Sequence, residues 1–135
     1  MAEVVLLDGG MGQELTRRHG APPHPLWSAK VMWEDPDAVR AAHEDFLAAG
    51  ARVITVNAYT LTRPRLARHG EEDRLVELQR LACRLAGEAR AAAGGGAAIA
   101  GCLPPLAGSY RAEVVPPFEE ALALYREIVA LQAPH

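Results

Sequence analysis

The sequence predicts an α/β fold with parallel strands, and three of its features support that prediction. An apolar, strand-like segment alternates with helix-like segments three times along the 135-residue chain. The strand-like segments are continuously apolar, which is typical of parallel strands that are buried on both faces. Each of them ends in a polar or glycine-rich turn, the place where α/β proteins usually hold their ligands. The length suits one domain.

The first unit begins with an expected strand over residues 4–7, which Asp8 closes. Gly9 and Gly10 follow, and a short helix is expected over residues 13–18. An acid followed by two glycines leaves two interpretations open. The motif forms a local turn, in which glycine supplies a positive φ and Asp8 acts as a cap, or it holds Asp8 and the glycine backbone out toward a ligand.

The second unit begins with a typical helix start, because Asp35 is a good N-cap and Pro36 suits the first helical position. Apolar residues then recur at helical spacing as far as Gly50. The strand-like segment 52–59 follows at once and is rich in β-branched residues. Polar residues, Asn57 among them, stand at its end.

The third unit contains an expected helix over residues 72–92 with one apolar face, and then an expected strand over 97–102. A last amphipathic helix is expected over 117–132. Because the carboxyl ends of parallel strands meet at one edge of a sheet, we expect Asp8, Asn57 and the loop at Gly101 to converge.

Other residues that could carry chemistry give weaker signals. Trp27 and Ser28 lie in what the sequence suggests is a long loop, where Trp27 either lines a cleft or packs on a helix. The five histidines are scattered through loops and polar helix faces, are interpreted as solvated, and show no helical metal-site spacing. Cys83 is expected to lie in a helix with its side chain buried. Cys102 stands at a strand end, but the sequence shows no general base placed to activate its thiol.

Composition argues against several functional classes. The chain has 14 basic and 17 acidic residues, a formal charge of −3, and no basic stripe interleaved with aromatic residues, so nucleic acid and anionic membranes are not expected partners. No apolar segment approaches the roughly 18–20 residues that a membrane helix needs. The acidic N-terminus is no secretory signal and the cysteines lack a CxxC spacing, which indicates a cytoplasmic protein. The glycine cluster fits neither GxGxxG nor a P-loop, so an unrelated nucleotide-binding domain is a weak alternative.

Three stretches, taken together, resemble the homocysteine S-methyltransferase family, which includes betaine-dependent and S-methylmethionine-dependent enzymes. They are LLDGGMGQEL, PLWSAKVMWEDPDAVRAAHEDFLAAGARVITVNAYTLTRPRLARHG and IAGCLPPLAGSYR. The resemblance implies a (β/α)8 TIM barrel with parallel strands. This chain would supply the first three βα units as one partial homocysteine-binding domain over residues 1–135, so the barrel is incomplete in this chain.

The resemblance also implies a reaction. A methyl group passes from a sulfonium or ammonium donor to the thiol of homocysteine, giving methionine, and a zinc ion held by three cysteine thiolates activates that thiol. The family's zinc cysteines lie in later strands. Cys83 and Cys102 do not match them, so no zinc is expected in this chain alone.

The same resemblance assigns substrate-binding roles around the cleft. Asp8 would accept a hydrogen bond from the homocysteine amino group, close to the backbone of the glycine turn. The full set of expected substrate-binding residues is Asp8, Gly9, Gly10, Trp27, Ser28, Asn57 and Tyr59. The chain departs from the family at Gln13, where Thr is commoner, and at Cys102, where many relatives have Ser.

A second hypothesis is a non-catalytic half-barrel that binds homocysteine or assembles with a partner chain. The sequence is expected to form the N-terminal part of a larger barrel domain. Three strands leave the apolar faces of residues 4–7, 53–56 and Ile99 open to water. Such a surface predicts self-association or pairing with a missing C-terminal half.

Overall fold

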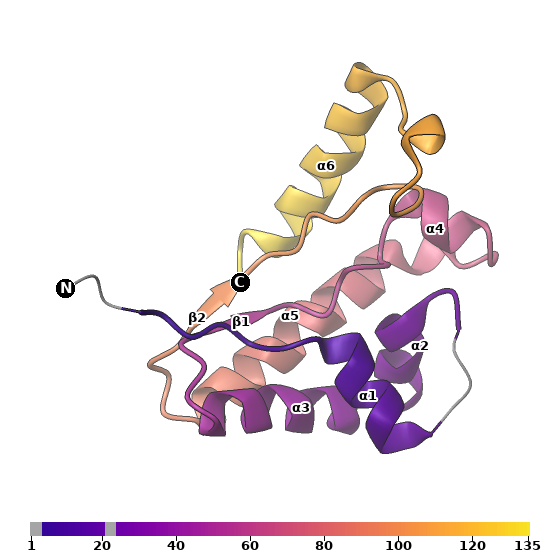
Figure 1. Cartoon of the computed structure of the whole chain (residues 1–135). Coiled ribbons are helices and arrows are strands. Elements are labelled where there is room, and N and C mark those ends of the chain that lie inside the picture. The colour runs from indigo at the N-terminus through magenta and orange to yellow at the C-terminus, as the bar shows by residue number, and fades with distance from the viewer. Residues whose placement is uncertain (1–3, 21–23) are drawn as a thin grey trace.

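The computed structural model describes residues 4–20 and 24–135. Its elements in chain order are α1 (Met11–His19), α2 (Trp27–Glu34), α3 (Pro36–Ala48), β1 (Val53–Thr55), α4 (Arg63–Ala67), the 3₁₀ turn η1 (Glu72–Arg74), α5 (Leu75–Ala92), β2 (Ala98–Ala100), the 3₁₀ turn η2 (Ala112–Val114) and α6 (Phe118–Gln132). The group α1–α3 lies on one side of the strands and α6 on the other (Figure 1). None of the helices in the described residues is long and apolar enough to cross a membrane.

The sheet is parallel, as the sequence predicts. β1 pairs with β2 in a register that places Ile54 opposite Ile99. On the other edge of β1, Leu7 forms a parallel bridge to Val53. The Asp8 N–H donates to the Val53 carbonyl at 3.0 Å, which fixes the chain just where the first strand-like segment ends. Three chain segments therefore run in the same direction and bring their carboxyl ends to one edge.

The expected strand over residues 4–7 is wrong apart from Leu7, which forms only an isolated bridge. The segment is exposed rather than buried, from 48% at Val5 to 89% at Val4, because it pairs on one edge and the described residues do not cover its apolar side chains. The expected exposure of 53–56 is wrong at Ile54 and Val56, which are buried. The other two strands are also shorter than expected, because the chain bends away after Thr55 and Ala100.

The helices with clear caps and periodicity form where the sequence predicts them. The Asp35 side chain accepts a hydrogen bond from the Ala38 N–H at 3.2 Å and starts α3. α5 begins at Leu75, after the 3₁₀ turn, and buries one stripe of apolar residues against α3. α6 packs on α5, although its apolar stripe is only partly covered, with Ile128 buried and Phe118 exposed.

Two helices lie where the sequence analysis expects none. α2 occupies the supposed long loop around Trp27 and buries Ala29 and Met32. α4 begins after Thr62, whose side chain accepts a hydrogen bond from the Arg65 N–H. Both helices are short, so packing against the rest of the molecule stabilises them more than their own propensity does.

The expectation that the histidines are solvated is wrong for His43. Its side chain is fully buried on α3, one helical turn after the buried Val39. Neither ring nitrogen has a hydrogen-bond partner within the described part of the chain. Burial lowers the pKa of His43 to about 4, while the nearby charge of Asp8 acts in the opposite direction.

Candidate functional site

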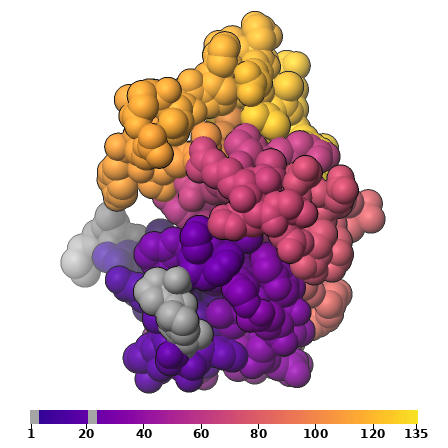
Figure 2. All heavy atoms as spheres, turned by 90° about the vertical axis from the view of Figure 1, so that its right-hand side faces the viewer, coloured from indigo at the N-terminus to yellow at the C-terminus, as the bar shows by residue number. Residues whose placement is uncertain are grey.

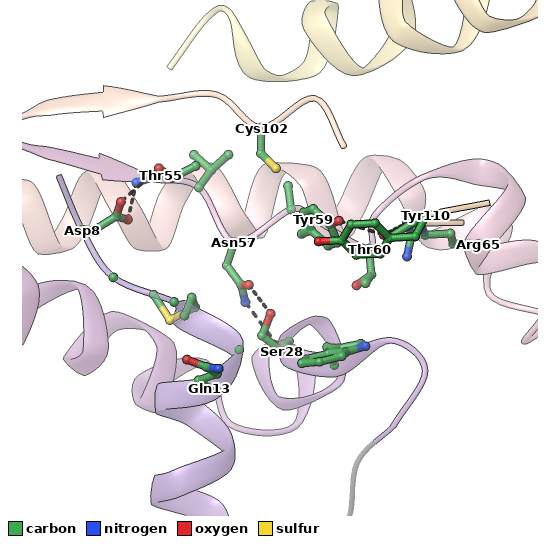
Figure 3. A pocket seen from close by; sticks show the side chains of 18 residues that line it. Asp8, Gln13, Ser28, Thr55, Asn57, Tyr59, Thr60, Arg65, Cys102 and Tyr110 are labelled. Carbon is green, nitrogen blue, oxygen red and sulfur yellow. Dashed lines mark hydrogen bonds between the residues drawn. The ribbon is translucent and has the colours of Figure 1, made fainter. Parts of the chain in front are cut away.

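A cavity of about 720 Å³ lies where the parallel segments end. All seven residues that the sequence analysis expects at a substrate site line it, and so does Cys102 from the third strand end. Figure 3 shows that the labelled side chains reach it from several elements. The described residues that line it are Asp8, Gly9, Gly10, Met11, Gly12, Gln13, Trp27, Ser28, Thr55, Val56, Asn57, Ala58, Tyr59, Thr60, Arg65, Cys102, Ser109 and Tyr110. The expected convergence is therefore confirmed: residues from all three strand ends line one cavity.

The Asp8 carboxylate is held in place by Thr55 at the end of β1. The Thr55 N–H donates to Oδ2 at 2.6 Å and the Thr55 hydroxyl donates to Oδ1 at 3.1 Å. These bonds fix the carboxylate at the cavity wall, and each oxygen keeps a lone pair for a further donor. The sequence gives no separate signal for Thr55, because a β-branched residue is ordinary in a strand.

The glycines after Asp8 serve close packing and not a left-handed turn. Neither Gly9 nor Gly10 has a positive φ, so that part of the turn interpretation is wrong. A Cβ on Gly9 would lie 2.8 Å from Cε1 of Phe46, and one on Gly12 would lie 3.3 Å from Cε3 of Trp27. The glycines thus let aromatic side chains approach the backbone beside the cavity.

The N-terminus of α1 adds hydrogen-bond donors next to Asp8. Gly10 is its N-cap and supplies no side-chain hydrogen bond, and the first helical bond runs from the Glu14 N–H to the Gly10 carbonyl at 3.1 Å. The N–H groups of residues 11–13 therefore have no acceptor within the helix. Such an end carries partial positive charge and favours anions.

Ser28 and Asn57 are bonded to each other rather than presented freely to the cavity. The Ser28 hydroxyl donates to Asn57 Oδ1 at 2.5 Å, and Asn57 Nδ2 donates to the Ser28 carbonyl at 3.2 Å. Both residues are buried, so each satisfies the other's polar groups. The pair ties the start of α2 to the end of β1 and thereby holds Trp27 at the rim.

Three aromatic rings remain exposed at the cavity: those of Trp27, Tyr59 and Tyr110. Trp27 has φ 47° and Tyr110 has φ 59°, a region that bulky residues rarely adopt. Backbone strain of this kind is concentrated at functional sites. Exposed aromatic faces are also well suited to bind cationic groups.

Arg65 is a residue that the sequence analysis missed. It is the only Lys or Arg among the described residues that line the cavity. The helix that contains Arg65, α4, can be predicted from the sequence, because Thr62 followed by Pro64 is a typical helix start. That signal predicts a helix at this position, although it does not predict the direction of the Arg65 side chain.

The described residues do not fit the three-cysteine zinc site of the resemblance. No group of three His, Cys, Asp or Glu side chains in this part of the chain could hold a metal. Cys83 is buried in α5, as expected. Cys102 lines the cavity, but burial raises the pKa of its thiol, and the Gln132 side chain binds its backbone N–H at 2.8 Å and its carbonyl at 3.2 Å.

Comparison with known proteins gives consistent results. A family profile described as Homocysteine S-methyltransferase matches residues 5–134. Homocysteine S-methyltransferase YbgG of Bacillus subtilis is 36% identical over 91 residues, covering 64% of this chain and 28% of the relative. Homocysteine S-methyltransferase 4 of Zea mays is 41% identical over 87 residues, covering 63% and 25%.

The fold has a close counterpart among solved structures. The crystal structure of the homocysteine methyltransferase MmuM of Escherichia coli in its metallated form superposes with a TM-score of 0.84 at 31% identity. The superposition covers 98% of this chain and 51% of MmuM. The chain thus spans about half the length of that enzyme and about a quarter of the two curated relatives. The profile match extends over nearly the whole sequence, and the chain belongs to the homocysteine S-methyltransferase family.

Proposed function

We propose that this chain forms the homocysteine-binding part of an S-methyltransferase, which transfers a methyl group from a sulfonium or ammonium donor to homocysteine and produces methionine. Family membership supports the proposal. The observation that carries it is the pairing of Asp8 with the uncapped N-terminus of α1 at one end of the cavity. The parallel register and the similarity to MmuM support the further proposal that the chain supplies the first three units of a (β/α)8 barrel.

The two ends of an amino-acid zwitterion match these two groups. The ammonium of homocysteine donates to the lone pairs that Thr55 leaves free on Asp8. The carboxylate accepts from the N–H groups at the start of α1. Because both groups belong to one short chain segment, residues 8–13, at one end of the cavity, the amino acid is oriented with its thiol directed into the rest of the cavity.

The aromatic rim suits the methyl donor. Sulfonium and ammonium groups bind to the faces of aromatic rings, and Trp27 and Tyr59 keep about half or more of their surface exposed, at 60% and 47%. In this proposal Ser28 and Asn57 act by holding Trp27 in place, since their hydrogen bonds are made to each other.

Zinc, when bound, lowers the pKa of a thiol and supplies a thiolate nucleophile. The described residues provide no set of ligands for it, so we assign this chain no step at the metal. Its own contribution is to bind and orient the amino acid. We keep a cytoplasmic location in the proposal, because both cysteines are free thiols.

A second candidate function is a half-barrel that binds homocysteine without catalysis or that assembles with a partner chain. The exposed apolar segment Val4 to Leu7 favours it. Homocysteine binding is common to both candidates, so it is the property to measure first.

The test is a calorimetric titration of homocysteine into the wild type and D8N. We expect D8N to weaken binding about ten- to a hundredfold, because it removes a charged acceptor for the ammonium. The analogue 4-sulfanylbutanoate lacks the amino group and should bind both proteins equally. D37N is the control, because Asp37 is an exposed carboxylate on α3. Equal homocysteine affinity in the wild type and D8N contradicts the proposal.

A further inference from the structure

Arg65 is held rigidly at the cavity wall. Its Nε and Nη2 atoms donate to the Pro105 carbonyl at 3.1 and 3.0 Å, and Nη2 also donates to the Ser109 hydroxyl at 3.1 Å. Its Nη1 atom has no acceptor among the described residues. One part of the guanidinium therefore fixes the side chain, and another part is left to bind a ligand.

Tyr59 completes this arrangement. The Arg65 Cζ atom lies 5.4 Å from the centre of the Tyr59 ring, and the Tyr59 hydroxyl shares a hydrogen bond of 2.8 Å with Ser109. Ser109 thus contacts both the guanidinium and the phenol. Because these contacts fix the guanidinium before a ligand arrives, binding costs less conformational entropy.

Arg65 lies at the end of the cavity opposite Asp8 (Figure 3). The ammonium and carboxylate of an amino acid are attached to the same carbon atom. An amino acid bound through Asp8 and the start of α1 therefore cannot also reach Arg65. The cavity of about 720 Å³ is large enough for a second small ligand beside it.

The charge of Arg65 restricts what this second ligand can be. A methyl donor with an onium centre is cationic, and a fixed guanidinium repels it. A carboxylate on the same donor reverses the sign of that interaction and gains charge-assisted hydrogen bonds. We propose that Arg65 is a specificity-determining residue that binds the carboxylate of the methyl donor and disfavours onium donors without one. This inference rests on the proposed function.

The experiment uses two probes of matched shape. Dimethylsulfoniopropionate carries the carboxylate, and dimethyl(3-methylbutyl)sulfonium carries an isopropyl group in its place. Both are titrated by NMR into the wild type, R65Q and R65K. In the wild type the carboxylate probe should bind more tightly. R65Q should weaken binding of the carboxylate probe about ten- to a hundredfold and leave the affinity for the isopropyl probe unchanged or higher. R65K keeps the positive charge but lacks the planar guanidinium, so its loss of affinity for the carboxylate probe should be intermediate.

R68Q is the matched control. Arg68 directly follows α4 and its Nη1 atom donates to the Ala107 carbonyl at 2.6 Å, so it supports the same segment without lining the cavity. R68Q should change neither affinity. Melting curves of all variants report whether they fold.

Two results overturn the inference. The first is equal wild-type affinity for the two probes, and the second is an equal effect of R65Q on both, which would make Arg65 a support for residues 105–109 only. If homocysteine still binds in an Asp8-dependent way, only the Arg65 inference fails and the proposed function stands. If homocysteine does not bind but the probes are discriminated through Arg65, the proposed function fails and the carboxylate site stands.

Discussion

Acid should destabilise this protein through His43. The side chain is fully buried, neither ring nitrogen has a hydrogen-bond partner in the described residues, and burial lowers its pKa to about 4 from the ordinary 6.5. The nearby Asp8 carboxylate offsets part of that burial effect without cancelling it. We expect the free energy of unfolding to fall as the pH falls from about 6.5 to about 4.

The sign follows from proton uptake. Between these two pH values the unfolded chain binds a proton at residue 43 and the folded chain does not, so each lowering of the pH favours unfolding. The difference between the two pKa values corresponds to about 3 kcal/mol when the whole interval is crossed. That is a large share of the roughly 5–15 kcal/mol that stabilises an ordinary domain.

The assay is urea unfolding followed by circular dichroism at several pH values between 7 and 4, for the wild type and H43L. Leucine fills a similar buried space and does not titrate. The wild type should lose about 3 kcal/mol more than H43L over this range. His24, whose pKa burial also lowers, titrates in both proteins and cancels in the comparison. Parallel stability curves for the two proteins would refute the reasoning, because they would mean that His43 accepts its proton in the folded state at an ordinary pKa.

Two further predictions concern packing at the site, and urea unfolding measures both. G9A should lower the free energy of unfolding by about 1–3 kcal/mol, because the new Cβ would lie 2.8 Å from Phe46 Cε1. G87A is the control, because Gly87 lies in α5 with open space around it. This substitution should raise the free energy of unfolding by up to about 1 kcal/mol. N57A should cost about 1–3 kcal/mol, because it leaves buried polar groups of Ser28 without partners. The N57A/S28A double variant should lose less than the sum of the single variants, and strict additivity would contradict a coupled pair.

The parts of the fold that the sequence predicts correctly are those with strong local signals. The start of α3 depends on Asp35 and Pro36, and the long apolar stripe of α5 depends on its own spacing. Neither needs information from elsewhere in the chain. The expected strand at residues 4–7 failed for the opposite reason, because an apolar run becomes a strand only when neighbouring segments pair with it and cover it.

The burial of His43 has a signal in the sequence. The residue stands four residues after Val39, in register with the buried stripe of α3, so helical periodicity predicts burial. The expectation of a solvated side chain rests on residue type alone and is wrong because position in the helix decides burial here. α2 is not evident from the sequence because its eight residues lie in a short segment between Pro25 and Pro36, and only the packing of Met32 shows that this segment is helical.

The two ends of the cavity differ in how they are built, and this difference explains which site residues could be predicted. Asp8, Asn57 and Cys102 stand at the ends of paired segments, so the strand pattern alone places them at one edge. Arg65 is placed by side-chain hydrogen bonds to the loop residues Pro105 and Ser109, which no local pattern encodes. Figure 2 shows that this C-terminal part of the chain, orange to yellow, forms a separate region of the surface above the N-terminal helices.

This construction has a consequence for specificity. Groups fixed by strand ends keep their position, whereas groups held by loops can change with the loop without disturbing the sheet. The Asp8 end therefore suits a ligand whose recognition must stay constant, which in the proposed function is homocysteine. In the proposed function, the Arg65 end suits the methyl donor. An exchange of the residue at position 65 or in the loop 105–109 would change the charge preference at this end, while Thr55 would continue to hold Asp8.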